Sequence, residues 1–136
     1  MEKTVALKIS LKPDEKMILG GAVIKNGSHP SVFFIENNVL VLREKDIITE
    51  ELADTPCKRI YYTVQLMYLD DKNLPQYHAI YWRQVGELID FVKSMGPLVT
   101  ELGEHLLACE YYKALKTAKK MIAYEKELLE HAKQCV

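Results

Sequence analysis

The side chains best suited to catalysis or metal binding are four histidines and three cysteines, and they are scattered along the chain. The cysteines, Cys57, Cys109 and Cys135, form no Cys-x-x-Cys pair of the kind found in many zinc sites. The sequence also lacks Gly-x-Ser-x-Gly, Gly-x-Gly-x-x-Gly and phosphate-loop motifs. We therefore expect no catalytic residues, no metal site, no cofactor and no enzymatic activity. An enzyme would need a deep pocket that places a histidine or cysteine beside a carboxylate.

Basic residues near the start of the chain are better candidates for a functional site. Arg43 ends an apolar run, and a guanidinium at a sheet edge can form paired hydrogen bonds with a phosphate or stack on a base. Lys8 and Lys12 share the polar side of the first predicted strand, and Lys16 follows its turn. These residues predict a local basic strip. The alternative is an ordinary surface ion pair of Arg43 with a neighbouring acidic residue, Glu44 or Asp46.

Two further groups of side chains have a binding and a structural interpretation. Lysines near the start of the last predicted helix form either a basic binding face or a solvated helix face. Aromatic residues in the helical half are either stacking surfaces for bases or core side chains, and their helical spacing favours the core. The lysines are Lys113, Lys116, Lys119 and Lys120, and the aromatic residues are Tyr61, Tyr62, Tyr77, Tyr81, Trp82, Tyr111 and Tyr112.

The elements that position the basic strip are short β-strands in residues 1–47. Alternation of apolar and polar residues from Val5 to Leu11 predicts a half-buried strand. Gly20-Gly21 is expected to form a strand corner or bulge. Asn26-Gly27 is a strong turn signal, because both residues tolerate positive φ. Further strands are predicted at Met17–Leu19, Ala22–Lys25, Val32–Ile35 and Val39–Arg43. This spacing is typical of a small antiparallel β-sheet or a barrel-like unit.

Residues 48–136 show the period of helices. A short helix is predicted from Ile47 to Leu52, and Thr55-Pro56 is a strong start signal for the next helix. Another helix follows Asn73 and is expected to stop at Gly96-Pro97. The last two helices are predicted at Leu98–Leu107 and from Glu110 to about Gln134, the latter burying Tyr111, Leu115, Ala118, Ile122 and Leu129. The fold class is therefore α+β: a β-unit at 1–47, followed by a bundle of about four helices at 48–136.

Composition limits the function classes. With 49% hydrophobic and 27% charged residues, the 136-residue chain is typical of a soluble globular protein. Its 18 basic and 19 acidic residues nearly cancel, which excludes binding to nucleic acid or membranes through bulk charge. No apolar run approaches the about 20 residues of a membrane span. The odd cysteine number and the absence of a signal-peptide pattern indicate the cytoplasm.

Eight strings spread along nearly the whole chain form one recognisable pattern. They are Leu7–Lys16, Gly21–Gly27, Ile35–Asn37, Val41–Ile47, Thr55-Pro56, Arg59–Tyr62, Gln65–Asp70 and Tyr111–Lys116. Together they resemble the FlbT family of bacterial flagellin-synthesis regulators. One departure is Asp14, where the family typically has Gly in a Pro-Gly-Glu-Lys turn.

The FlbT resemblance implies a post-transcriptional regulator of flagellum assembly without catalytic residues. Family members are associated with binding the 5′ untranslated region of flagellin mRNA and promoting its decay, and some are described as activators instead. The implied partners are therefore a flagellin mRNA leader and a FlaF-type companion regulator. The resemblance leaves the direction of regulation open.

A second pattern in the N-terminal part consists of Pro13-x-Glu15, a strand reaching Gly20, and the string Arg43-Glu44-x-x-Ile47. This pattern is similar to the carbon storage regulator family CsrA, a small β-structure dimer that binds RNA. Arg43 matches that family's RNA-contacting arginine, and Lys12 matches a basic position, whereas Leu11 departs from another. By this similarity, mRNA would be recognised near Arg43 with backbone contacts from Lys8, Lys12 and Lys45. The candidate RNA-binding set is Lys8, Lys12, Lys16, Arg43 and Lys45.

A protein-binding module is the alternative from another class. It would hold flagellin or a companion regulator against the tyrosine-rich helical surface, without direct RNA contact. The near-neutral charge favours this alternative, because mRNA-binding proteins usually carry a more obvious basic surface. A positive strip through Lys8, Lys12 and Arg43 would support RNA, and an exposed apolar groove among the helices would support protein. Homo-oligomerisation is left open.

Overall fold

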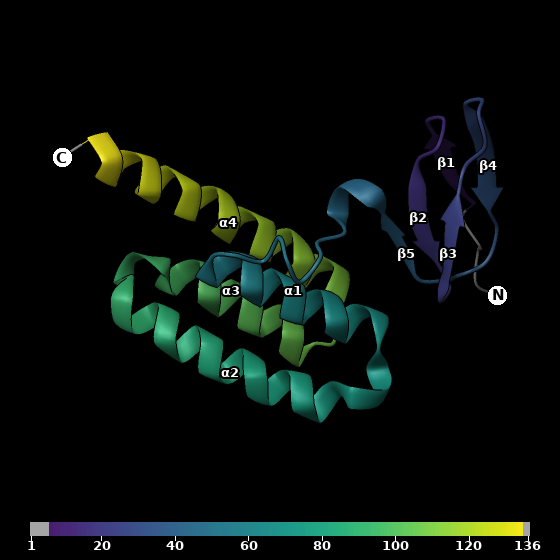
Figure 1. Ribbon diagram of the computed structural model, residues 1–136. Helices are drawn as coiled ribbons and strands as arrows, with labels where there is room; N and C mark the ends of the chain where they lie inside the picture. Colours follow the sequence, from purple (N-terminus) through teal and green to yellow (C-terminus); the bar gives the residue numbers. More distant parts are fainter. Residues whose placement is uncertain (1–5, 135–136) are drawn as a thin grey trace. The chain divides into compact units, whose positions relative to one another are not determined.

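The computed structural model describes residues 6–134 and has the predicted α+β architecture (Figure 1). The described chain divides between Ile47 and Ile48 into two compact parts, here called the β-unit and the helical unit. The β-unit contains β1 (Leu7–Leu11), β2 (Lys16–Leu19), β3 (Ala22–Lys25), β4 (Ser31–Ile35), β5 (Val41–Arg43) and the 3-10 turn η1 (Glu44–Asp46). The helical unit contains α1 (Pro56–Leu69), η2 (Asp71–Asn73), α2 (Leu74–Phe91), η3 (Lys93–Met95), α3 (Gly96–Leu107) and α4 (Tyr111–Gln134).

The β-unit consists of two small antiparallel sheets that share one core. β1 pairs with β4, and β2 lies between β3 and β5. The predicted alternation in β1 is confirmed, because Ile9 and Leu11 are buried while Lys8 and Ser10 point to solvent. Leu7 is half exposed, and Val5 lies outside the described residues. Ile9, Leu11, Met17 and Ile35 form the core. The partly buried side chains packed around them are Leu19, Ile24, Phe33, Val39 and Val41.

Both glycine-containing segments singled out in the sequence connect consecutive strands. Gly20-Gly21 joins β2 to β3 as a two-residue hairpin loop, and its φ angles of 57° and 93° are ones that glycine adopts without strain. Asn26-Gly27 lies in the connection between β3 and β4, and neither residue has a positive φ. The Asn26 side chain shapes this segment instead, because its Nδ2 donates to the carbonyls of Lys12 (2.8 Å) and His29 (3.0 Å).

The helical unit begins with an irregular segment that contains turns at 50–52, rather than the predicted helix at 47–52. Gln65 on α1 explains the difference: its Oε1 accepts from the Ile48 N–H (2.8 Å) and its Nε2 donates to the Ile48 carbonyl (2.9 Å). These two hydrogen bonds satisfy the N–H and the carbonyl of Ile48, so these groups need no partner within a helix. The predicted start of α1 is confirmed, because Thr55 is the N-cap, accepts from Lys58 N–H and precedes a proline at the first helical position.

The four helices pack around a core to which every helix contributes. α1 packs against α2 and α4, and α3 packs against α4 (Figure 1). α2 ends at Phe91, so Gly96-Pro97 opens α3 rather than ending α2 as expected. The buried helical side chains include Ile60, Val64, Met67, Tyr81, Leu88, Leu102, Leu106, Ala114, Leu115, Ala118 and Met121. Among the described residues, no helix combines the length and the apolar character that crossing a membrane requires.

The buried stripe of α4 ends earlier than predicted. Leu115 and Ala118 are buried as expected, but Tyr111 and Ile122 are only partly buried. Leu129 is 51% exposed. The last turns of α4 therefore present apolar side chains that no other described element covers.

Candidate functional site

Of the two described cysteines, Cys57 is the one that lies beside a carboxylate, that of Glu125. Glu125 on α4 accepts from the Cys57 backbone N–H at 3.0 Å, and the Cys57 side chain is fully buried. Burial and the adjacent Glu125 carboxylate raise the pKa of the Cys57 thiol to about 12. Because the thiolate is the nucleophilic form, this arrangement suppresses reactivity rather than creating it.

His105 and Cys109 are four residues apart, a spacing that metal ligands can use. His105 instead lies between two carboxylates, with Nε2 4.0 Å from Glu101 and Nδ1 3.9 Å from Glu110. Glu110 also contacts Lys113 at 2.7 Å. In residues 6–134, no group of three or more His, Cys, Asp or Glu side chains is arranged so that it could hold a metal ion.

Arg43, the central residue of the predicted basic strip, connects the two sheets of the β-unit. Its Nη2 donates to the Ser10 carbonyl on β1 (2.5 Å) and lies 3.4 Å from a carboxylate oxygen of Glu15. The Arg43 side chain remains 32% exposed. The ion-pair partner is thus Glu15 from the β1–β2 turn, and not the neighbouring Glu44 or Asp46 considered from the sequence.

Glu15 organises the turn in which Lys12 and Lys16 lie. Its Oε1 accepts from the Lys12 N–H at 2.8 Å while its Oε2 faces Arg43. The hydrogen bond from Lys12 and the charge of Arg43 lower the pKa of Glu15 below its ordinary value of 4.5. The Lys16 N–H donates to Glu44 (3.2 Å), which ties the start of β2 to η1. Two of the predicted basic residues, Lys12 and Arg43, therefore contact the Glu15 carboxylate, whereas Lys16 contacts Glu44.

The outward face of the β1–β4 sheet combines one lysine with exposed apolar side chains. Lys8 is directly opposite Phe34 in the sheet register, and Ser10 is opposite Val32. Phe34 is 60% exposed and Val32 is 58% exposed, although both lie in the middle of a strand. We call Lys8, Ser10, Val32 and Phe34 the β1–β4 outer face.

The predicted basic residues are thus distributed over three neighbouring places in the β-unit. Lys8 lies on the β1–β4 outer face, and Lys45 is an exposed residue of η1. Lys12 and Arg43 contact Glu15, and Lys16 follows Glu15 in the chain and contacts Glu44. Phe34 and Val32 were not predicted as candidate residues. The signal for them is the register: once Phe33 is placed opposite Ile9 in the core, Phe34 must point outward.

The helical lysines and tyrosines fit the structural interpretation better than the binding one. Lys113 pairs with Glu110, Lys120 lies 3.3 Å from Glu101, and Lys116 lies over the Tyr112 ring. The tyrosines Tyr61 and Tyr81 are core residues. Of the other predicted aromatic residues, Tyr77 donates its hydroxyl to Asp70, whereas Trp82 and Tyr112 are 57% and 46% exposed.

Comparison with known proteins gives one consistent result. Residues 7–129 match the family model described as flagellar protein FlbT. The chain is 40% identical over 129 residues to the flagellum biosynthesis repressor protein FlbT of Caulobacter vibrioides, covering 92% of this chain and 90% of that protein. It is 41% identical over 123 residues to a probable flagellum biosynthesis repressor FlbT of Rhodopseudomonas palustris, covering 90% and 97%. No solved structure gives a significant match.

Proposed function

The chain belongs to the FlbT family, and we propose that it is a post-transcriptional regulator of flagellin synthesis that binds flagellin mRNA. The names of its relatives support a regulatory role in flagellum synthesis, with repression as the direction of control. In this proposal the chain acts in the cytoplasm on the 5′ untranslated region of the message. It controls stability or translation without catalysing a reaction itself.

The β1–β4 outer face is the observation that best supports RNA binding. An exposed aromatic ring in the middle of a strand offers a stacking platform for an unpaired base. Lys8, directly across the sheet from Phe34, is placed to neutralise the phosphate of the same nucleotide. Val32, which lies on the same strand opposite Ser10, adds a second exposed apolar side chain to this face. A stacked base with a phosphate beside it is a feature of single-stranded RNA, and paired bases are not accessible in this way.

The residues around Glu15 extend the proposed site from the β1–β4 outer face. Lys12 and Lys16 contribute positive charge on either side of the β1–β2 turn, and Lys45 adds charge from η1. Arg43 has two roles in this proposal. Its contacts with Ser10 and Glu15 hold the site together, and its exposed part contacts the RNA.

The experiment is fluorescence anisotropy with a labelled flagellin leader RNA across a salt series. We expect Phe34→Ser to weaken binding by about 1–3 kcal/mol, because one stacked base is lost. Lys8→Gln should weaken binding uniformly and reduce the magnitude of the salt slope by about 1, because one phosphate contact is lost. Val23→Ser is the matched control, since Val23 is 73% exposed on β3, outside the proposed site.

A direct role in RNA recognition would be ruled out by unchanged affinity in both site variants, or by the absence of binding at low salt. In that case the alternative function, binding of flagellin or a FlaF-type companion regulator, would take its place. Circular dichroism of each variant separates loss of binding from loss of fold.

A further inference from the structure

The side-chain amide of Asn26 holds three segments of the β-unit together. Its Nδ2 donates to the carbonyls of Leu11 (3.3 Å) and Lys12 (2.8 Å) at the end of β1, and to the carbonyl of His29 (3.0 Å) before β4. Its Oδ1 accepts from the Ser31 hydroxyl at 2.9 Å. Both the donor and the acceptor atom of this side chain are therefore engaged.

The residue after Asn26 is Gly27, and an asparagine followed by glycine is prone to deamidation. In that reaction the backbone nitrogen of the second residue attacks the side-chain carbonyl carbon of the asparagine, and glycine has no side chain to obstruct the attack. Gly27 is exposed, and a Cβ atom placed on it would meet no atom within 4 Å. Within residues 6–134, the Gly27 N–H donates no hydrogen bond. Nothing around the attacking nitrogen itself therefore opposes the reaction.

The native contacts of Asn26 supply the protection instead. Its backbone N–H donates to the Glu15 carbonyl at 2.9 Å, and the Gly27 carbonyl accepts from the Asp14 N–H at 3.0 Å. The peptide group between Asn26 and Gly27 is thus held on both sides by the β1–β2 turn. Ring closure needs this peptide and the Asn26 side chain to rotate until the Gly27 nitrogen reaches Cγ. That rotation breaks the hydrogen bonds of the amide, so the reaction requires a local opening of the β-unit.

We propose that Asn26 is a deamidation site that reacts when the β-unit opens and that, once modified, prevents the β-unit from closing again. The deprotonated Gly27 nitrogen forms a bond to Cγ of Asn26, and the side-chain nitrogen takes up a proton and leaves as ammonia, which gives a cyclic imide. Water then opens the ring at either of its carbonyls and leaves aspartate or isoaspartate. Water is the only co-reactant, and nothing is oxidised or reduced.

Neither product fits the place that the amide occupies. A carboxylate has no hydrogen to donate, and its negative charge would face the carbonyls of Leu11, Lys12 and His29. Isoaspartate also lengthens the main chain by one carbon, between the two backbone hydrogen bonds to the β1–β2 turn. Deamidation therefore converts a transient opening of the β-unit into a lasting loss of its structure.

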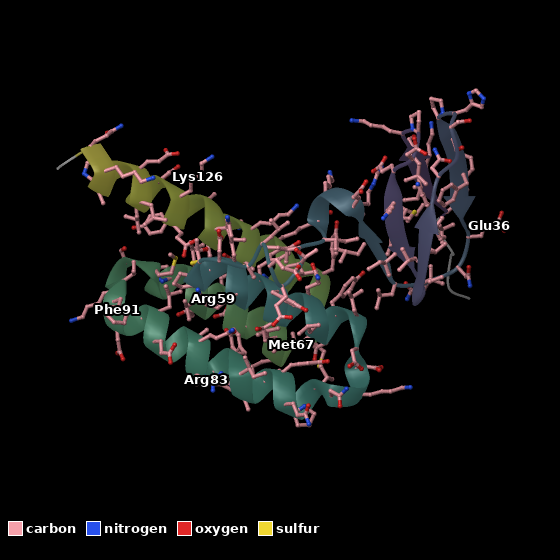
Figure 2. All side chains as sticks on the ribbon, viewed as in Figure 1. Glu36, Arg59, Met67, Arg83, Phe91 and Lys126 are labelled. Carbon is pink, nitrogen blue, oxygen red and sulfur yellow. The ribbon has the colours of Figure 1, made fainter. Side chains whose placement is uncertain are left out.

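The test is peptide mapping by mass spectrometry after incubation of the full chain at pH 8, with and without urea. We expect position 26 to be modified about tenfold faster in urea than in the folded chain, because urea removes the protecting hydrogen bonds. Asn38 is the internal control. It is exposed in the loop after Glu36, which projects away from the β-unit in Figure 2, but it precedes Val39, whose branched side chain obstructs the attack. Asn38 should stay unmodified under both conditions.

Two variants separate the chemistry from the protection. Gly27→Ala adds a methyl group in open space at a residue without positive φ, so it should keep the fold and slow the reaction severalfold in urea. Ser31→Ala removes the hydrogen bond to Oδ1 of Asn26 and should speed the reaction in the folded chain.

A further pair of variants tests the consequence of the modification. Asn26→Asp carries one product, and Asn26→Ala removes the same hydrogen bonds without adding charge. Asn26→Asp should lower the urea midpoint of the β1 and β4 amide NMR signals further than Asn26→Ala does.

The proposal is overturned if position 26 is modified equally fast in the folded and the unfolded chain, or in neither. It is also overturned if Asn26→Asp has the urea midpoint of the unmodified chain, because the product would then fit the β-unit. RNA is absent from all these measurements, so their outcome does not depend on the RNA-binding proposal.

Discussion

Glu125 on α4 accepts a hydrogen bond from the backbone N–H of Cys57, in the first turn of α1, at 3.0 Å. Its other carboxylate oxygen accepts from the Thr55 hydroxyl, which itself caps α1. A side chain 68 positions along the chain thus completes the N-terminus of α1. The negative charge also lies where the helix dipole is positive.

We predict that Glu125→Ala lowers the free energy of unfolding by about 1–3 kcal/mol, because a helix-terminal donor and the Thr55 hydroxyl lose a charged acceptor. Glu127→Ala is the control, since Glu127 is exposed on the same helix. It should change stability by less than about 0.5 kcal/mol. Urea unfolding measures both, and equal effects would show that Glu125 does not act as a cap.

Cys57 should react far more slowly with iodoacetamide than Cys109. The Cys57 thiol is buried with its pKa raised to about 12, whereas Cys109 is exposed. Mass spectrometry of a Cys135→Ser variant at pH 8 would measure the extent of labelling at Cys57 and at Cys109 separately. We expect labelling of Cys57 only after denaturant is added, and rapid labelling of native Cys57 would contradict the proposed suppression of its thiolate.

Tyr81→Phe should raise stability by about 1 kcal/mol. The Tyr81 hydroxyl is buried without a partner among the described residues, so its removal relieves a desolvation cost. Tyr77→Phe is the opposite case, because it loses the 2.7 Å hydrogen bond from the Tyr77 hydroxyl to Asp70 and should cost about 0.5–1.5 kcal/mol. Urea unfolding of both variants measures these changes. The assignment would be contradicted if both substitutions raised, or both lowered, the free energy of unfolding.

The Glu15 carboxyl should titrate below 4.5, its ordinary pKa, because the Lys12 N–H and Arg43 stabilise its ionised form. Since the folded pKa is lowered, the stabilisation is present above the unfolded pKa and is lost as the pH falls through the folded pKa. The stability difference between the unmodified chain and Glu15→Gln should therefore disappear in acid. Arg43→Met should move the Glu15 pKa upward by NMR titration, and an unchanged pKa would mean that Arg43 does not act on Glu15.

Local sequence patterns predict the elements of this fold where the partner of each group is nearby in the chain. The alternation in β1 and the Thr55-Pro56 start of α1 are examples, because a period of two and a helix cap are local properties. The irregular segment that starts at Ile48 could not be predicted in this way. Its backbone is satisfied by Gln65, a residue 17 positions away that no local pattern identifies.

The contacts within the candidate site could not be predicted from local sequence patterns either. The sequence identifies Arg43 as a charged residue at a strand end, but its partner Glu15 depends on how the two sheets meet. Phe34 reads as part of an apolar run, and only the pairing of Phe33 with Ile9 shows which of the two phenylalanines is exposed. The hollow beside Phe91 is lined by the first turn of α1, the end of α2 and the last turns of α4. It could not be predicted from the sequence, because it depends on where these helix termini lie relative to one another.

The most direct test of the central claim is ultraviolet crosslinking of the full chain to a labelled flagellin leader RNA, followed by peptide mapping. The account predicts crosslinks in the β1 and β4 peptides, centred on Phe34, that Phe34→Ser removes and Val23→Ser retains. Crosslinks confined to residues 48–136 would contradict it, because RNA contact would then lie on the helical unit.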